Sequence, residues 1–173
     1  DEITRLPEYY PTRCERQILT REAESIAAFG ADTLLELGSG TSDKTRILLG
    51  AMRDRGDLAR YVPFDVSEGT LRASTAQLAQ EFPGMEIHGV VGDFDRHIDR
   101  LPGGGKRLVA FLGGTIGNLD RPQRKQFLAT LANTLASGYG LLLGADLVKR
   151  WDRLIRAYDD SLGVTAEFNR NVL

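Results

Sequence analysis

Apolar and polar positions along the chain alternate between short, continuous apolar runs and longer stretches with helical spacing. The apolar runs predict strands, at residues 33–37, 60–66, 85–91, 108–112 and 141–144. The other stretches predict helices, at residues 14–29, 42–54, 68–82, 95–101, 121–136, 149–161 and 165–173. This alternation predicts an α/β fold with a doubly wound, mostly parallel sheet of about five strands.

Single residues refine this picture. Thr12 with Glu15 three positions on predicts a capping box at the start of the first helix. Ser67 and Asp120 are expected to cap later helices. Pro63 lies inside the second predicted strand, which indicates an edge position or a bulge. Helix 121–136 is expected to bury Phe127, Leu128, Leu131 and Leu135.

Residues 34–45 combine an apolar run, a tight turn at 38–40 and a helix start, a layout typical of a nucleotide-type cofactor site. A phosphate-binding P-loop, G-x-x-x-x-G-K-S/T, fits at Lys44 but fails at Asp43, which adds negative charge beside a polyanion. A dinucleotide fingerprint, G-x-G-x-x-G, fails at the same aspartate. S-adenosylmethionine carries a sulfonium cation and no phosphate, so its site tolerates acids.

Acidic residues follow each of the first strands. Glu36 ends the first, Asp65 ends the second and Asp93 follows the third. Because ligands of open parallel sheets bind beyond the carboxyl ends of the strands, we expect these acids to gather on one rim. Asp65 would accept from ribose hydroxyls, and Asp93 from the adenine amino group with Phe94 against the ring. Singly, each acid is explained as a strand-end or capping residue, but together they favour S-adenosylmethionine.

A second candidate loop, residues 111–120, follows the fourth predicted strand on the same rim. Its glycines allow close approach of a ligand to the backbone, and Asn118 supplies both a donor and an acceptor. A methyl acceptor would lie here, facing a methyl donor. A plain loop with an Asx turn or helix cap at Asn118 explains the same residues.

Composition limits the classes of function. The chain has 173 residues, 42% of them hydrophobic, and a net charge of −2, which suits one compact domain. It has no basic block, so we expect no binding to nucleic acid. A single cysteine, Cys14, excludes an internal disulfide and suits a cytoplasmic location. No apolar stretch is long enough for a membrane span, and no signal peptide is visible.

Specific motifs carry a family resemblance, and they lie at residues 4–13, 36–46, 63–66, 92–94, 111–119, 146–149 and 156–160. In these motifs the chain resembles the histidine-specific Nα-methyltransferases of ergothioneine biosynthesis. The resemblance implies a Rossmann-like class I methyltransferase core over residues 31–173, with a helical segment, residues 1–30, contributing to the substrate site. It also implies S-adenosyl-L-methionine as cofactor, L-histidine as substrate and trimethylhistidine (hercynine) as product.

The resemblance assigns roles to individual residues. The expected cofactor contacts are Gly38, Lys44, Asp65, Asp93 and Phe94. Histidine would be held by Gly113 and Asn118 at its amino acid head, Tyr158 at its carboxylate and Tyr9 near its imidazole. No acid–base residue and no metal is assigned, since the reaction depends on placing the amine in line with the methyl group.

Members of this family continue beyond both ends of the chain, and their C-terminal portion completes the sheet. We therefore expect missing terminal segments to act as partners of this chain, and strand 141–144 to form an exposed edge. Two alternatives remain: a non-catalytic cofactor-binding fragment, and a nucleotide hydrolase based on the near P-loop.

Overall fold

A single parallel sheet organises the protein, in a computed structural model that describes residues 10–98, 104–148, 150, 155 and 164. Its strands are β1 (Thr33–Leu37), β2 (Arg60–Asp65), β3 (Glu86–Ile87), β4 (Val90–Val91), β5 (Arg107–Phe111) and β6 (Gly140–Leu143). The strand order is β3-β2-β1-β5-β6, and β4 pairs with β2 beyond β3. Each pairing is parallel.

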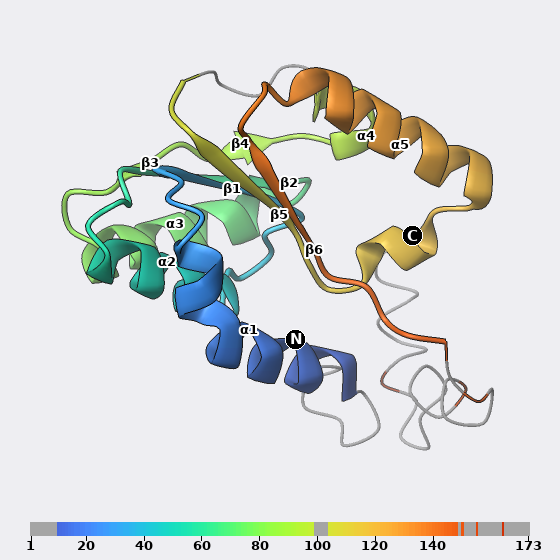
Figure 1. Ribbon diagram of the computed structural model, residues 1–173, viewed down its shortest axis with the longest axis horizontal. Helices are drawn as coiled ribbons and strands as arrows, with labels where there is room; N and C mark the ends of the chain where they lie inside the picture. The colour runs from blue at the N-terminus through green and yellow to red at the C-terminus, as the bar shows by residue number, and fades with distance from the viewer. Residues whose placement is uncertain (1–9, 99–103, 149, 151–154, 156–163, 165–173) are drawn as a thin grey trace.

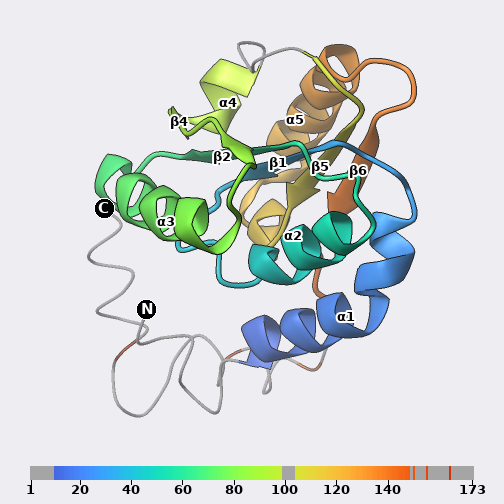
Figure 2. The same ribbon diagram turned by 90° about the vertical axis from the view of Figure 1, so that its left-hand side faces the viewer.

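Helices cover both faces of the sheet (Figures 1 and 2). One face carries α1 (Tyr10–Ala27), α2 (Thr45–Asp54) and α3 (Glu68–Glu81), and the other carries α4 (Phe94–His97) and α5 (Arg121–Thr134). A short 3-10 helix, η3 (Thr115–Asn118), precedes α5. The predicted doubly wound α/β fold is therefore confirmed in the described part of the chain.

The strand sequences divide the core into two clusters. In β5, Leu108 and Ala110 pack with the helices of the first face, while Val109 and Phe111 pack with those of the second. Successive side chains of a strand leave opposite faces, so a continuous apolar run supplies both clusters at once. This explains why the apolar positions of β1 and β5 are buried on both faces, while the polar residues Thr33, Glu36 and Arg107 are buried among them.

Pro63 explains a break in the third predicted strand. β3 pairs with Arg60 and Tyr61, β4 pairs with Phe64 and Asp65, and Pro63 lies between these ladders. Proline has no backbone N–H, so it cannot donate to a neighbouring strand there. The expectation of an edge position is wrong, because β2 pairs with β1 on its other side through Pro63 itself.

Two helix starts differ from the prediction. α1 begins at Tyr10 rather than 14, with Pro11 in its first turn, where its missing N–H costs nothing. The expected Thr12–Glu15 capping box is wrong, since both residues lie inside the helix. α2 begins at Thr45 rather than 42, because the preceding turn runs through the left-handed Ser42 (φ 56°).

Later caps and the far edge follow the prediction in part. Ser67 caps α3, and Asp120 forms a full capping box with Gln123 on α5. Leu128 was expected to be buried but is 37% exposed.

β6 ends the strand order, with Leu141 and Leu143 each 40% exposed, as expected for an edge. The helices predicted at 149–161 and 165–173 fall almost entirely outside the described residues.

Candidate functional site

The turn between β1 and α2, residues 38–44, lies at the carboxyl end of the sheet. The N–H groups of Gly38 and Ser39 donate to the carbonyl oxygen of Phe64, at 2.8 and 3.1 Å. Gly38 and Gly40 have φ of 70° and 50°, and a Cβ on either would meet nothing within 4 Å. A side chain at these positions would strain the backbone and enter space that a ligand can use.

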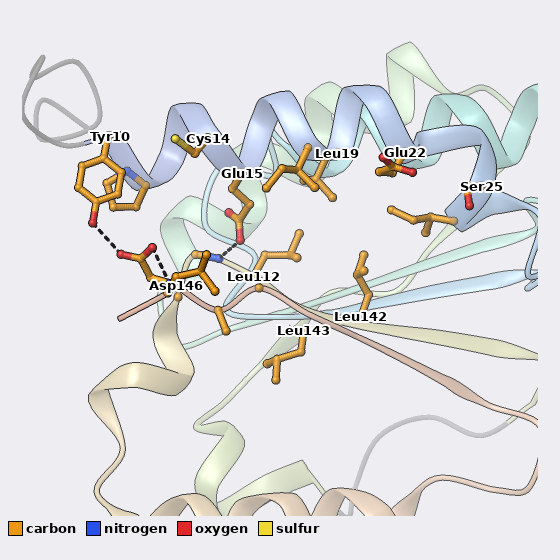
Figure 3. Close-up of a pocket in the computed structure, with 18 residues that line it drawn as sticks. Tyr10, Cys14, Glu15, Leu19, Glu22, Ser25, Leu112, Leu142, Leu143 and Asp146 are labelled. Atoms are coloured by element: carbon orange, nitrogen blue, oxygen red, sulfur yellow. Dashed lines mark hydrogen bonds between the residues drawn. The ribbon is translucent and has the colours of Figure 1, made fainter. Parts of the chain in front are cut away.

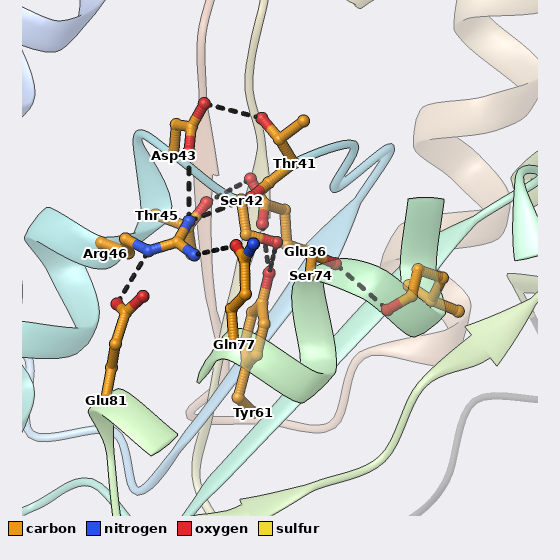
Figure 4. Close-up of polar contacts among 11 residues, drawn as sticks. Glu36, Thr41, Ser42, Asp43, Thr45, Arg46, Tyr61, Ser74, Gln77 and Glu81 are labelled. Atoms are coloured by element: carbon orange, nitrogen blue, oxygen red, sulfur yellow. Dashed lines mark hydrogen bonds and ion pairs between the residues drawn. The ribbon is translucent and has the colours of Figure 1, made fainter. Parts of the chain in front are cut away.

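A buried hydrogen-bond network supports this turn from below (Figure 4). Glu36 is 3% exposed and accepts from Thr45 Oγ1 and from the Tyr61 hydroxyl, each at 2.5 Å. The Tyr61 hydroxyl oxygen also lies 2.9 Å from Ser42 Oγ. This hydrogen bond to β2 helps to hold Ser42 in its left-handed backbone conformation, which a non-glycine residue rarely adopts. The network ties β1, β2, the turn and the first residue of α2 together.

Burial changes the protonation of this network. It raises the pKa of Glu36 from 4.5 to about 7, against the opposing hydrogen bonds from Thr45 and Tyr61 and the charge of Lys44. Burial, together with the Glu36 carboxylate, also raises the pKa of Tyr61 well above its ordinary value. The expectation that Glu36 lies on the open rim is wrong, because these two hydroxyls hold it beneath the turn.

Asp65 and Asp93 do lie near each other at the carboxyl ends of β2 and β4. Asp65 pairs in register with Val91, and the N–H of Gly92 donates to the Asp65 carbonyl oxygen at 3.0 Å. The Asp65 carboxylate accepts from the Gly40 N–H at 2.8 Å, which joins it to the turn. Asp93 pairs with Arg96 at 3.8 Å.

The other Asp65 oxygen accepts from the Ser67 N–H at 2.9 Å. A carboxylate has about four lone-pair sites, so both of its oxygens can still accept from a ligand. Phe94 is the first residue of α4, directly after Asp93. The glycine turn, Asp65 and Asp93 therefore form one continuous rim.

Asp43 and Lys44 do not form a phosphate cradle. The Asp43 side chain is 62% exposed and pairs with Arg46 at 3.2 Å (Figure 4). Lys44 forms an ion pair with Glu15 of α1. A P-loop has a glycine where Asp43 stands, and a carboxylate at that position repels a polyanion, so the geometry argues against a phosphate ligand.

The loop after β5 carries the second candidate group. Gly113 and Gly114 are both left-handed, with φ of 79° and 69°, and lead into η3, which Asn118 ends. Asn118 is exposed. The cap of α5 is Asp120, not Asn118, so the helix-cap explanation of Asn118 is wrong.

A pocket of about 620 Å³ lies between α1 and the ends of β5 and β6 (Figure 3). Its walls are mainly aliphatic, from Ile18 and Leu19 on α1 to Leu142 and Leu143 on β6. Glu15 and Gly113 line it at the rim, where the Glu15 carboxylate accepts from the Gly113 N–H at 2.8 Å. Tyr10 closes one end by donating to Asp146 at 2.7 Å.

The structure thus brings Gly38, Asp65 and Asp93 together on one rim, and it brings Lys44 close to Gly113 through Glu15. Tyr9 and Tyr158 lie outside the described residues. Sequence reasoning missed Glu15 and Tyr61. The position of Tyr61 within an apolar strand was a signal for a buried hydroxyl, but nothing local linked Glu15 to the loop 98 residues away.

Within the described ranges, no group of three or more His, Cys, Asp or Glu is placed to hold a metal ion. None of the helices described has the length and apolar character that a bilayer crossing requires.

Comparison with known proteins gives consistent matches. The family model "Histidine-specific methyltransferase, SAM-dependent" matches residues 1–173. The histidine N-alpha-methyltransferase of Mycolicibacterium smegmatis is 64% identical over all of this chain, which covers 54% of that protein. Ergothioneine biosynthesis protein 1 of Neurospora crassa is 32% identical, with 100% of this chain and 20% of that protein covered.

A solved structure supports the fold alone. A putative methyltransferase from Bacillus halodurans superposes with a TM-score of 0.53 at 19% identity, covering 77% of this chain and 53% of that one.

Proposed function

Because the chain belongs to the histidine-specific, S-adenosylmethionine-dependent methyltransferase family, we propose that the whole protein methylates the α-amino nitrogen of L-histidine. The product would be trimethylhistidine (hercynine), for ergothioneine synthesis. The fold is the Rossmann-like class I methyltransferase fold. The chain spans about half the length of its mycobacterial relative (54%), so activity and substrate are proposals for the whole protein. A cytoplasmic location belongs to the same proposal, since the exposed thiol of Cys14 suits a reducing compartment.

The described residues fit an S-adenosyl ligand. The space beside Gly38 and Gly40 is open, and the Ser39 hydroxyl is buried without a hydrogen-bond partner among the described residues. A buried hydroxyl without a partner is costly, and a ligand group could satisfy it. Asp65 would bind the ribose hydroxyls, Asp93 the adenine amino group with Phe94 on the ring, and Lys44 the carboxylate of the methionine moiety.

Histidine would bind on the Gly113 side of this rim. The Gly113 N–H already donates to Glu15, which leaves the Gly113 carbonyl oxygen as its contribution to the substrate. That oxygen would accept from the α-amine, and Asn118 would bind the amino acid head with its donor and acceptor. The aliphatic pocket beside Gly113 adds room on that side. Tyr9 and Tyr158 complete the proposed site from outside the described residues.

The protein's task is mainly to position the amine. When bound, S-adenosylmethionine supplies an electrophilic methyl group. The α-amine of a free amino acid is mostly protonated near pH 7, and the neutral minority is the form that can attack. Gly113 and Asn118 would hold its nitrogen in line with the methyl carbon, about 3–3.5 Å away. Each transfer removes an N–H donor, and tyrosine faces with the carboxylate rim would accommodate the growing cation.

The observation that carries this proposal is the bond from the Gly40 N–H to the Asp65 carboxylate, which joins the glycine turn to the strand-end acid at one rim. The Asp43 carboxylate, which stands where a P-loop has glycine, speaks against nucleotide hydrolysis. A non-catalytic binding fragment is the remaining alternative, and a measurement of methyl transfer distinguishes it from an enzyme.

The test is methyl transfer by the full-length natural chain, with deuterated-methyl S-adenosylmethionine and histidine, followed by mass spectrometry. We expect label on the α-nitrogen of histidine. N-acetylhistidine is the matched control, since its acylated nitrogen cannot attack. Binding of S-adenosylhomocysteine without any transfer to histidine would contradict the proposed activity and favour the non-catalytic alternative.

A further inference from the structure

Glu15 of α1 contacts the parts of the molecule assigned to both ligands. One of its carboxylate oxygens forms the ion pair with Lys44, and the other accepts from the Gly113 N–H at 2.8 Å. Its side chain is 15% exposed and that of Lys44 is 19% exposed, so solvent screens this pair only partly. A single carboxylate therefore holds the start of α2 and the loop after β5.

Gly144, which has no side chain, leaves space for the Glu15 carboxylate. A Cβ built on Gly144, at the end of β6, would lie 2.2 Å from the Glu15 Oε1 atom and 3.1 Å from the Leu112 Cα. Any side chain at position 144 would therefore displace the carboxylate. A Cβ built on Gly113 would lie 3.8 Å from the Lys44 Nζ atom, so the Lys44 ammonium and the Gly113 loop are neighbours.

We propose that Glu15 is a positioning residue that sets the Lys44 ammonium and the Gly113 loop relative to each other. The inference rests on the proposed function, in which Lys44 contacts the cofactor and Gly113 the amino acid acceptor. An ammonium has three N–H donors, so Lys44 keeps Glu15 and still donates to a ligand carboxylate. Two successive glycines allow the Gly113–Gly114 backbone many conformations, and the hydrogen bond from the Gly113 N–H to Glu15 restricts them.

The two oxygens of Glu15 allow its two contacts to be separated. Glu15→Gln removes the charge beside Lys44 but keeps a carbonyl oxygen for the Gly113 N–H. Glu15→Ala removes both contacts. Gly144→Ala leaves Glu15 in the sequence but displaces its carboxylate. Glu24→Gln is the matched control, because Glu24 is an exposed residue of the same helix and undergoes the same loss of charge.

The experiment measures S-adenosylhomocysteine affinity by calorimetry, and kcat and the KM for histidine, in the full-length natural chain. We expect Glu15→Gln to weaken S-adenosylhomocysteine about 10-fold with a smaller effect on the histidine KM, since a misplaced group costs up to about 100-fold. Glu15→Ala should also raise the histidine KM and lower kcat/KM about 100-fold. Gly144→Ala should change the affinity and the kinetic constants as Glu15→Ala does. Glu24→Gln should leave them at their wild-type values.

A merely structural role predicts a different pattern. Variants that only lose stability would show a lower Tm with unchanged affinity, KM and kcat per folded molecule, and that result would overturn the proposal. Unchanged or tighter S-adenosylhomocysteine binding in Glu15→Gln would also overturn it. Failure of the wild type to methylate histidine would instead overturn the proposed function, while the binding comparison would still decide the role of Glu15.

Discussion

The two sides of the site are built in different ways. The side proposed to bind the cofactor, around residues 38–44, rests on a buried network within the first two strands and the start of α2, and it meets α1 at Lys44 through Glu15. The side proposed to bind the acceptor, around residues 113–118, is exposed at Gly113, Gly117 and Asn118 and is held to α1 by Glu15. A turn supported from below is preorganised before any ligand arrives, whereas an exposed glycine loop depends on distant segments. We therefore expect cofactor binding to be the more self-contained of the two functions.

The largest expected effect concerns Glu36, at the base of the cofactor turn. Its pKa is about 7 in the folded protein against 4.5 ordinarily, so folding favours its protonated form. The stabilisation is complete below about pH 4.5 and is lost as the pH rises to about 7, a change of about 3 kcal/mol at 1.36 kcal/mol per unit.

The measurement for Glu36 is chemical denaturation of wild type and Glu36→Gln between pH 4.5 and 8. The unfolding free energy of the wild type should fall relative to that of Glu36→Gln as the pH rises to about 7, and the difference should then level off. Glu81→Gln is the control, since Glu81 forms an exposed pair with Arg46 and its loss should leave the wild-type pH dependence in place. A constant difference between wild type and Glu36→Gln would contradict the account.

The next effect concerns Asp65 on the proposed cofactor rim. Asp65→Ala removes the acceptor of the Gly40 N–H and the proposed ribose contact together. We expect S-adenosylhomocysteine to bind about 100-fold more weakly, since hydrogen bonds to charged groups contribute about 1.5–3 kcal/mol each. Calorimetry checks this, with Asp54→Ala, at the exposed end of α2, as the control. Unchanged affinity would remove Asp65 from the cofactor site.

The smallest effect sharpens the contrast with the acceptor side. Asn118→Ala should weaken histidine binding about 10-fold, because one or two hydrogen bonds of about 1 kcal/mol are lost. S-adenosylhomocysteine affinity and stability should hardly change, since Asn118 is exposed. Asn133→Ala on α5, also exposed, serves as the control. Equal losses of affinity for histidine and S-adenosylhomocysteine would mean that Asn118 does not act on the acceptor side alone.

The same contrast explains what the sequence could predict. β1 was predicted residue for residue, because its leucines at 34, 35 and 37 require burial on both faces of the sheet. Asp65 was predicted beside the turn because strand ends share one edge of a parallel sheet. Glu36 was misplaced, since position at a strand end does not reveal whether a side chain faces the rim or the buried layer below it.

Glu15 shows a different limit. Its spacing from Thr12 matched a local capping pattern, and a local pattern was the only signal available in the sequence. Its observed partners, Lys44 and Gly113, are 29 and 98 residues away and depend on how α1 packs. Contacts of that kind arise from the assembled fold and not from motif spacing.

The central claim is that the carboxylate-rimmed glycine turn binds an S-adenosyl ligand and not a nucleoside triphosphate. The most direct measurement is calorimetric titration of the full-length natural chain with S-adenosylhomocysteine, without histidine and in the presence or absence of magnesium ATP. We predict saturable binding that magnesium ATP does not displace. Binding of magnesium ATP that excludes S-adenosylhomocysteine would contradict the account.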